Sequence, residues 1–180
     1  VAGGGGGTAG GAARRWVHPD PRARVRPCGP SAHRLQRGRE SPQFFRETCA
    51  TAPDALRLEA GMLTAPDGSG TKLVGLVAVH CGSLAEGEKV VAPIKAFGPP
   101  VMDMIGPIPY CTQNSLLDPS FPKGALNYWK ASFLTELSDA AIDTLVDRFA
   151  DCPSPMSQIV VEHFHGKASR IEVAATACAM

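Results

Sequence analysis

Residues 56–81, with the sequence LRLEAGMLTAPDGSGTKLVGLVAVHC, decide the fold class of this chain. The first nine residues, 56–64, alternate between large apolar and other side chains well enough to predict a strand. Residues 66–70 (PDGSG) are a strong turn signal, because Pro, Asp, Ser and Gly each favour a tight turn. Residues 72–81 are almost wholly apolar, which predicts a central strand buried on both faces. The sequence therefore predicts a β-hairpin.

The sequence around this hairpin predicts further helices and strands. Ser83 and Glu86 form a capping box at the start of a helix, and Ser138 caps the best amphipathic helix of the chain. A short helix is expected to end before Pro53. Further strands are expected at residues 101–108, 126–134, 158–165 and 168–176. This order predicts an α+β domain over residues 43–180, with a mostly antiparallel sheet and helices packed on one face.

Residues 1–42 differ in composition from the rest of the chain. They hold eight of the 18 basic residues, all of them Arg, and only two of the 17 acidic residues, so this segment is strongly basic and residues 43–180 are acidic. Because this Gly-, Arg- and Pro-rich segment has no apolar period, we expect it to be irregular or disordered. An arginine-rich arm for nucleic acid is disfavoured, since Trp16 is its single aromatic residue. A segment translated out of its natural reading frame, left over from the end of a preceding domain, stays open.

The composition also argues against several classes of protein. No run of about 18 apolar residues could span a membrane. The six cysteines contain no C-x-x-C pair, which argues against a zinc site and against a disulfide framework. We therefore expect a cytoplasmic protein with reduced thiols, no bound metal and no membrane or nucleic-acid partner.

A series of short motifs follows in residues 108–177. In chain order they are Ile108-Pro109-Tyr110, Gln113, Leu117-Asp118, Pro122-x-Gly124, Tyr128-Trp129-Lys130, Leu134-x-x-Leu137-Ser138-Asp139, Pro153-Ser154-Pro155, Gly166, Arg170 and Ala175-Thr176-Ala177. This ordered set resembles the bacterial branch of the berberine-bridge-enzyme-like FAD-linked oxidases. The resemblance covers residues 43–180, about three quarters of the chain. It implies an enzyme of two lobes, in which an FAD-binding lobe is covered by the sheet of a substrate lobe.

The resemblance also implies what this chain lacks. Residues 43–180 look like most of the substrate lobe, and the glycine run at residues 3–7 looks like a turn near the end of the FAD-binding lobe. The flavin-attachment region is missing, and the last strand breaks off at Met180, where the family continues with an aromatic residue, His and Arg. We therefore expect a C-terminally truncated fragment of an FAD-dependent oxidoreductase. Its intact parent, with the missing FAD-binding lobe, would act on an alcohol, a sugar or a similar small molecule.

Whether this chain alone is an enzyme is uncertain, and we expect neither activity nor stably bound flavin. A stand-alone α+β binding or interaction domain without catalysis, and a pseudogene product, are the alternatives.

Flavin-dependent oxidation needs a group that removes a proton while hydride passes to the flavin. Four side chains are candidates for facing the substrate: Tyr128, Lys130, Gln158 and Glu162. Glu162 is the best-placed acid, with an ordinary solvent-facing carboxylate as the alternative, and Lys130 could hold an anionic group. His163 and His165 share the opposite face of that strand, a spacing that can bind metal, but no third ligand is evident. The sequence assigns no catalytic base, no cofactor-binding residue and no metal ligand.

Overall fold

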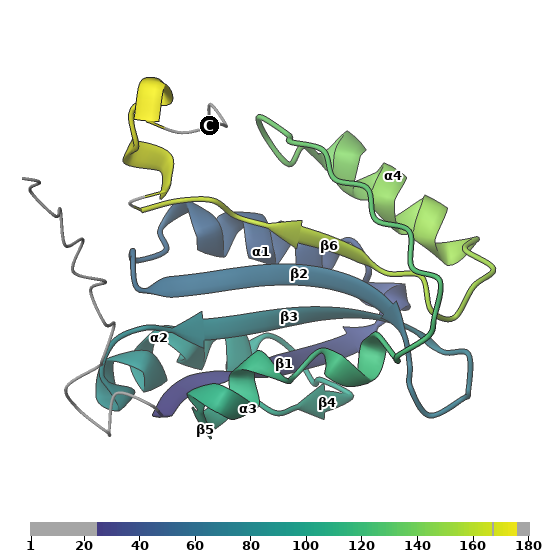
Figure 1. The fold of residues 1–180 in the computed structure, drawn as a ribbon, viewed down its shortest axis with the longest axis horizontal. Helices are drawn as coiled ribbons and strands as arrows, with labels where there is room; N and C mark the ends of the chain where they lie inside the picture. The colour runs from purple at the N-terminus through teal and green to yellow at the C-terminus, as the bar shows by residue number, and fades with distance from the viewer. Residues whose placement is uncertain (1–24, 167, 176–180) are drawn as a thin grey trace, which may run out of the picture.

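The computed structural model describes residues 25–166 and 168–175. Helices are combined there with an antiparallel sheet of six strands, which confirms the predicted α+β class (Figure 1). The strands are β1 (Val25–Arg34), β2 (Leu56–Thr64), β3 (Lys72–His80), β4 (Met102–Asp103), β5 (Gly106–Pro109) and β6 (Ile159–Glu162). The α-helices are α1 (Glu40–Ala50), α2 (Leu84–Ala96), α3 (Tyr110–Asn114) and α4 (Asp139–Ala150). Short 3₁₀ turns lie at Leu35–Arg37, Asp118–Ser120, Ala168–Arg170 and Val173–Ala175.

The predicted hairpin forms the centre of the sheet. The strand order is β4-β1-β3-β2-β6, with β5 also paired to β1, and every pair is antiparallel. In the hairpin, β2 pairs with β3 along its whole length, from Leu56 opposite His80 to Thr64 opposite Lys72. The turn between them has positive φ at Gly68 and Gly70, a conformation that glycine adopts without strain.

The apolar core lies on one face of the sheet. Alternate residues of β2, from Leu56 to Met62, are buried there against side chains of α1 and α2. Phe149 of α4 extends this core at the other end of β2, where it packs with Met62 and Val74. Figure 1 shows α1 behind the sheet and the short helix α3 in front of it. The three longer helices therefore share one face, as expected, and α3 lies on the other.

Both predicted helix caps are present. Ser83 and Glu86 form the reciprocal capping box at the start of α2, and the Ser138 hydroxyl accepts a hydrogen bond from the Ala141 backbone N–H at the start of α4. These bonds satisfy backbone donors that a helix start leaves without partners.

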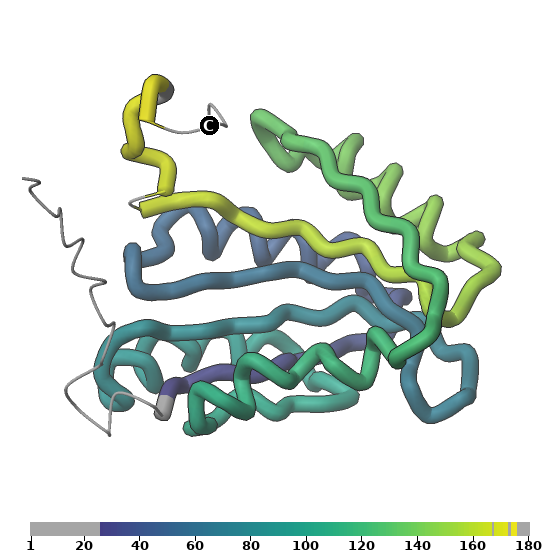
Figure 2. Tube along the Cα trace, viewed as in Figure 1, coloured from purple at the N-terminus to yellow at the C-terminus, as the bar shows by residue number. Residues whose placement is uncertain are grey.

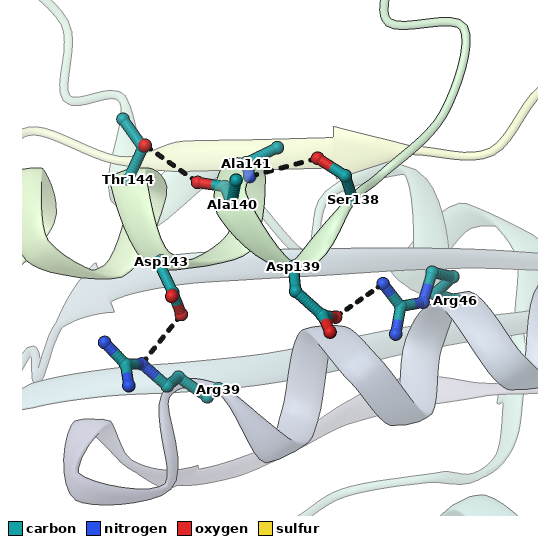
Figure 3. Close-up of polar contacts among 8 residues, drawn as sticks. All are labelled: Arg39, Arg46, Ser138, Asp139, Ala140, Ala141, Asp143 and Thr144. Carbon is teal, nitrogen blue, oxygen red and sulfur yellow. Dashed lines mark hydrogen bonds and ion pairs between the residues drawn. The ribbon is translucent and has the colours of Figure 1, made fainter.

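Two ion pairs join α4 to α1 and to Arg39, the residue before α1 (Figure 3). Arg46 binds Asp139 at 2.8 Å, and Arg39 binds Asp143 at 2.8 Å. Arg46 also donates a hydrogen bond to the Leu137 carbonyl oxygen at 2.9 Å, which fixes the approach of the chain to α4. Arg39 thus has a structural role, although the sequence placed it in an irregular segment.

The expectation that residues 1–42 are irregular is wrong for residues 25–42; residues 1–24 lie outside the described residues. Residues 25–34 form β1, which pairs with β3 on one side and with β4 and β5 on the other. Cys28, Ala32 and His33 are at most 2% exposed, so residues of β1 on both faces of the sheet are buried. A strand buried on both faces shows no polar–apolar alternation, and its Pro and Gly residues resemble loop sequence.

Several predicted strand boundaries were also wrong. Residues 126–134 form no strand, residues 168–175 form 3₁₀ turns in place of a strand, and residues 176–180 lie outside the described residues. The strand expected at 101–108 is divided into β4 and β5, and the one expected at 158–165 is limited to Ile159–Glu162. Strand propensity is expressed only where a neighbouring strand accepts the backbone hydrogen bonds, so these segments could not be judged from their own residues.

Candidate functional site

The sheet face opposite the apolar core carries the polar side chains of β2. Because side chains alternate along a strand, Arg57 and Glu59 point away from the face that buries Leu58 and Ala60. Gly61 lies in line with them on the same face of the strand. The register with β6 places Glu59 directly opposite Glu162 and Gly61 directly opposite Val160. We call this part of the face, made of Arg57, Glu59, Gly61 and Glu162, the open-face cluster.

Arg57 bridges the two carboxylates of the open-face cluster. Its Nε atom donates to Glu59 Oε1 at 2.6 Å, and its Nη2 atom donates to Glu162 Oε2 at 3.1 Å. The Glu59 side chain is only 17% exposed, whereas those of Arg57 and Glu162 are 55% and 40% exposed. Two carboxylates and one guanidinium are therefore held together, with Glu59 the most buried of the three side chains.

The electrostatics of the cluster follow from these contacts. Partial burial acts to lower the pKa of Arg57, but the hydrogen bond and charge of Glu59, with the charge of Glu162, raise this pKa above its ordinary value on balance. Cys28, which is fully buried, lies close enough to feel the same carboxylate. Burial first, and then the negative charge of Glu59, raise the pKa of the Cys28 thiol to about 11. Cys28 is therefore a protonated, unreactive thiol at neutral pH.

Glycine residues lie beside the charged groups. Gly61 of β2 and Gly75 of β3 are directly opposite each other. A Cβ atom at Gly61 would be in ordinary van der Waals contact with the Ile159 carbonyl oxygen, at 3.9 Å, and would fit without a shift of any described residue. Glycine in a strand interior weakens the strand and often marks a place where another group approaches the backbone closely.

The structure separates the four candidate residues from the sequence. Glu162 is the last residue of β6 and belongs to the open-face cluster, and Gln158 is half-buried one residue before β6 begins. Tyr128 and Lys130 are exposed in an irregular segment, and neither makes a hydrogen bond or ion pair with Glu162 among the described residues. No motif in the sequence pointed to Arg57 and Glu59. Their polar alternation within 56–64 was visible, but their pairing with residue 162 depends on the register.

The irregular segment is rich in exposed apolar side chains. Figure 2 shows that the chain between α3 and α4 crosses from the β1 side of the sheet to the β6 side. Within it, six large apolar residues are more than half exposed: Leu117, Leu126, Tyr128, Trp129, Phe133 and Leu134. The Trp129 ring lies 4.9 Å from that of Phe121, and the Phe133 ring lies 6.2 Å from that of Phe164, which follows β6. We call residues 126–134 the exposed aromatic segment; contiguous apolar surface of this kind usually marks an interaction site.

The histidine pair after β6 makes no metal cluster in the described part of the chain. The rings of His163 and His165 are stacked, with centroids 4.8 Å apart. His165 Nε2 lies 3.3 Å from the Pro53 carbonyl oxygen, so this nitrogen is engaged with backbone. No group of three or more His, Cys, Asp or Glu side chains suited to a metal ion occurs among the described residues. None of the described helices is long and apolar enough to cross a membrane.

Comparison with known proteins finds a similarity to an FAD-linked oxidoreductase. Over 95 residues, or 52% of this chain, the sequence is 30% identical to an FAD-linked oxidoreductase of Dictyostelium discoideum. The similar region spans 21% of the length of that protein, so the chain corresponds to about a fifth of it. The sequence matches no family model. The similarity supports a relationship with FAD-linked oxidoreductases.

Proposed function

We propose that this chain supplies the substrate-covering sheet of an FAD-dependent oxidoreductase of the berberine-bridge-enzyme-like family, bacterial branch. The observation that carries the proposal is the 95-residue similarity to an FAD-linked oxidoreductase. The sheet agrees with such a role, because one face is packed under helices while the other presents charged side chains around an open glycine backbone. The substrate in the intact enzyme would be an alcohol, a sugar or a similar small molecule.

We assign no FAD site to the described residues. The cavity between β1 and α2 has a volume of about 260 Å³ and is lined by groups such as Pro27, Val91 and Ile105. Pockets for small molecules usually measure about 300–1,000 Å³ and carry convergent polar groups. We therefore place the flavin on a separate FAD-binding lobe, the partner expected from the sequence. The cytoplasmic location also stays a prediction.

The exposed aromatic segment supports this arrangement. Side chains such as Leu126, Trp129 and Phe133 cost free energy when they face water, and a covering domain would remove that cost. A flavin-binding lobe that closes over the sheet would also exclude water from the substrate. A stand-alone interaction domain would use the same surface for a different partner, and it is the second candidate function for this reason.

The chain's own residues would bind and orient the substrate. The flavin, on its own lobe, would accept the hydride. Glu162 and Arg57 lie where a substrate held against the open sheet face would meet them, and they can accept and donate hydrogen bonds there. No residue is assigned as the base.

A chimera tests this proposal. The 95 matching residues of the Dictyostelium discoideum protein would be replaced by those of this chain, and flavin content and flavin reduction by a panel of alcohols and sugars would be measured. We expect the chimera to hold FAD and to be reduced by members of the panel. We also expect the purified chain alone to show no stoichiometric flavin absorbance at about 450 nm.

Two results would contradict the proposal. One is a folded chimera that holds FAD but is reduced by no alcohol or sugar, while the parent is reduced by its own substrates. The other is stoichiometric FAD on the chain alone, which would place a flavin site within these residues. A monomeric chain that unfolds cooperatively and binds no flavin domain would favour the stand-alone interaction domain.

A further inference from the structure

His33 of β1 is a buried histidine on the helix-covered face of the sheet. It pairs in register with Val74, which packs in the apolar core, and cross-strand partners share a face. The side chain is 1% exposed, and neither Nδ1 nor Nε2 makes a hydrogen bond within the described residues. Buried polar groups nearly always have such partners, and each exception calls for an explanation. A protonated imidazole would bury two N–H donors here without an acceptor.

The ring of Phe97 packs directly against His33. Phe97 follows α2, and the centroids of the two rings lie 5.2 Å apart in an edge-to-face arrangement. The Phe44 ring of α1 stacks on Phe97 at 4.2 Å, and the guanidinium carbon of Arg37 lies 5.1 Å from the Phe97 centroid. His33 is therefore covered by the residue that leads the chain from α2 towards β4.

Residues 97–104, which we call the edge segment, attach β4 to β1. The Val101 N–H donates to the Ala32 carbonyl oxygen at 2.8 Å, and the Met104 N–H donates to the Pro30 carbonyl oxygen at 2.9 Å. The side chains of Val101 and Met104 are 51% and 58% exposed, so they bury little apolar surface. Segments with few buried contacts open at a lower free energy than the whole domain. The packing at the start of the edge segment, over His33, therefore matters for its attachment.

The charges nearest to His33 come from the 3₁₀ turn after β1 and from α1. Burial first, and then the charge of Arg37, lower the pKa of His33. The charge of Glu40 and the Pro99 backbone, which is close to the ring without ordinary hydrogen-bond geometry, act to raise this pKa but do not outweigh them. Glu40 is already engaged, because Arg37 Nε donates to its Oε2 atom at 2.7 Å. The surroundings therefore favour the neutral ring.

The other charged groups on this face have partners of their own. Lys72 of β3 packs on the ring of α4, and its Nζ donates to the Cys152 carbonyl oxygen at 2.6 Å. Asp103 of β4 pairs with Lys95 of α2 at 2.6 Å. Burial acts to raise the pKa of Asp103, but hydrogen bonds, first that of Lys95, lower it on balance. This ion pair therefore stays charged at pH 5.5, where a histidine changes its charge.

We propose that His33 is a pH-sensitive switch for the edge segment: the neutral ring holds the segment on β1, and the protonated ring releases it. An imidazolium without partners is too costly to bury, so the ring takes up a proton only when Phe97 moves away and water reaches it. The edge segment then loses its packing, and the carbonyl groups of Ala32 and Pro30 become free. Acid would thus open this edge of the sheet. The inference goes beyond the proposed function and does not depend on it.

Amide hydrogen exchange of the purified chain, followed by NMR at pH 7.5 and 5.5, tests the switch. The amides of Val101 and Met104 report the edge segment, and those of the β2–β3 hairpin report unfolding of the whole domain. A histidine that titrates at about 6.5 when open, and lower when closed, makes opening about three- to tenfold more favourable at the lower pH. After correction for intrinsic exchange rates, the protection of Val101 and Met104 should fall by this factor.

Urea separates local release from global unfolding. About 1 M urea should leave the exchange of Val101 and Met104 nearly unchanged, because opening of a short segment exposes little surface. The hairpin amides should be better protected at both pH values, and their exchange should accelerate in urea.

Three variants connect the pH response to His33. His33→Leu should abolish the response of Val101 and Met104. Arg37→Gln keeps the histidine but removes the neighbouring cation and frees Glu40, so the response should shrink to less than about twofold. This variant also decides the question if His33→Leu does not fold.

His163→Gln is the matched control. His163 is half-buried, and burial first and then the charge of His165 lower its pKa, as for His33. Because it follows β6 and lies outside the edge segment, its replacement should leave the response of Val101 and Met104 unchanged.

Equal protection of Val101 and Met104 at the two pH values would overturn the inference. It is also wrong if Arg37→Gln or a folded His33→Leu keeps the full response, or if His163→Gln removes it. If these two amides share the protection and the urea dependence of the hairpin, acid unfolds the domain as a whole and the edge segment is no separate switch.

Discussion

Gly29 in β1 is the position where one added methyl group should damage the fold most clearly. Its φ is +147°, and a Cβ atom there would lie 2.3 Å from the Met104 carbonyl oxygen and 3.0 Å from the Ile105 Cα atom. The close approach arises because residues 104–105 run alongside β1 between its pairing with β5, which ends at Cys28, and its pairing with β4, which begins at Ser31. The obstructing atoms belong to the backbone, so no side-chain rotation can relieve the overlap.

The expected magnitude of Gly29→Ala has two parts. A non-glycine residue in a sparsely populated backbone region costs about 1–3 kcal/mol. Overpacking against a backbone that must move costs about 1–3 kcal/mol more. A total near 4 kcal/mol would lower the Tm by about 8–16 °C in a domain of this size.

The matched control is Gly68→Ala in the hairpin turn. Gly68 also has a positive φ, of +77°, but a Cβ atom there meets nothing within 4 Å. Only the backbone cost of about 1–2 kcal/mol remains. Thermal and urea unfolding followed by circular dichroism would measure both variants. If Gly29→Ala is at least as stable as Gly68→Ala, residues 104–105 do not lie against β1 as described and the placement of β1 is wrong.

Three further predictions follow from burial. His33 is 1% exposed, and burial first and then the charge of Arg37 lower its pKa. Protonation of His33 therefore opposes folding, so the free energy of unfolding should fall as pH drops below about 6.5. The variant His33→Leu should flatten this pH dependence in urea titrations at pH 7.5 and 5.5. Phe149→Ala should destabilise the chain by about 3–5 kcal/mol because the ring is 1% exposed; an equally large loss from a truncation in the exposed aromatic segment would contradict this account. Cys81 should react with a thiol reagent at neutral pH and Cys49 should not, because Cys49 is buried and burial raises its pKa to about 12; equal modification rates in the folded chain would refute this.

Local sequence signals predicted the parts of the fold that depend on neighbouring residues. The turn at 66–70 and the apolar run after it predicted the β2–β3 hairpin, and Ser83 and Ser138 correctly marked two helix starts. A turn or a cap is formed by a few consecutive residues, so its chemistry can be read along the chain.

Elements that depend on a distant partner were predicted poorly. Pro and Gly interrupt residues 25–34 and predict an irregular segment, yet pairing on both sides makes these residues a strand. The composition of residues 126–134 predicts a strand, yet they form none in this structure. Whether a stretch becomes a strand depends on the backbone groups that another segment offers it.

Local patterns along the chain predicted the fold class, the hairpin and the capped helices, and they pointed to Glu162 as the best-placed acid, a role that stays a prediction. Only the tertiary structure decided that Arg57 and Glu59 surround this carboxylate, and that Tyr128 and Lys130 make no ion pair or hydrogen bond with it. The physical reason is the register of β2 against β6, two strands separated by about a hundred residues, because a shift by one residue would turn Glu162 toward the core. The candidate site is thus a property of the assembled sheet.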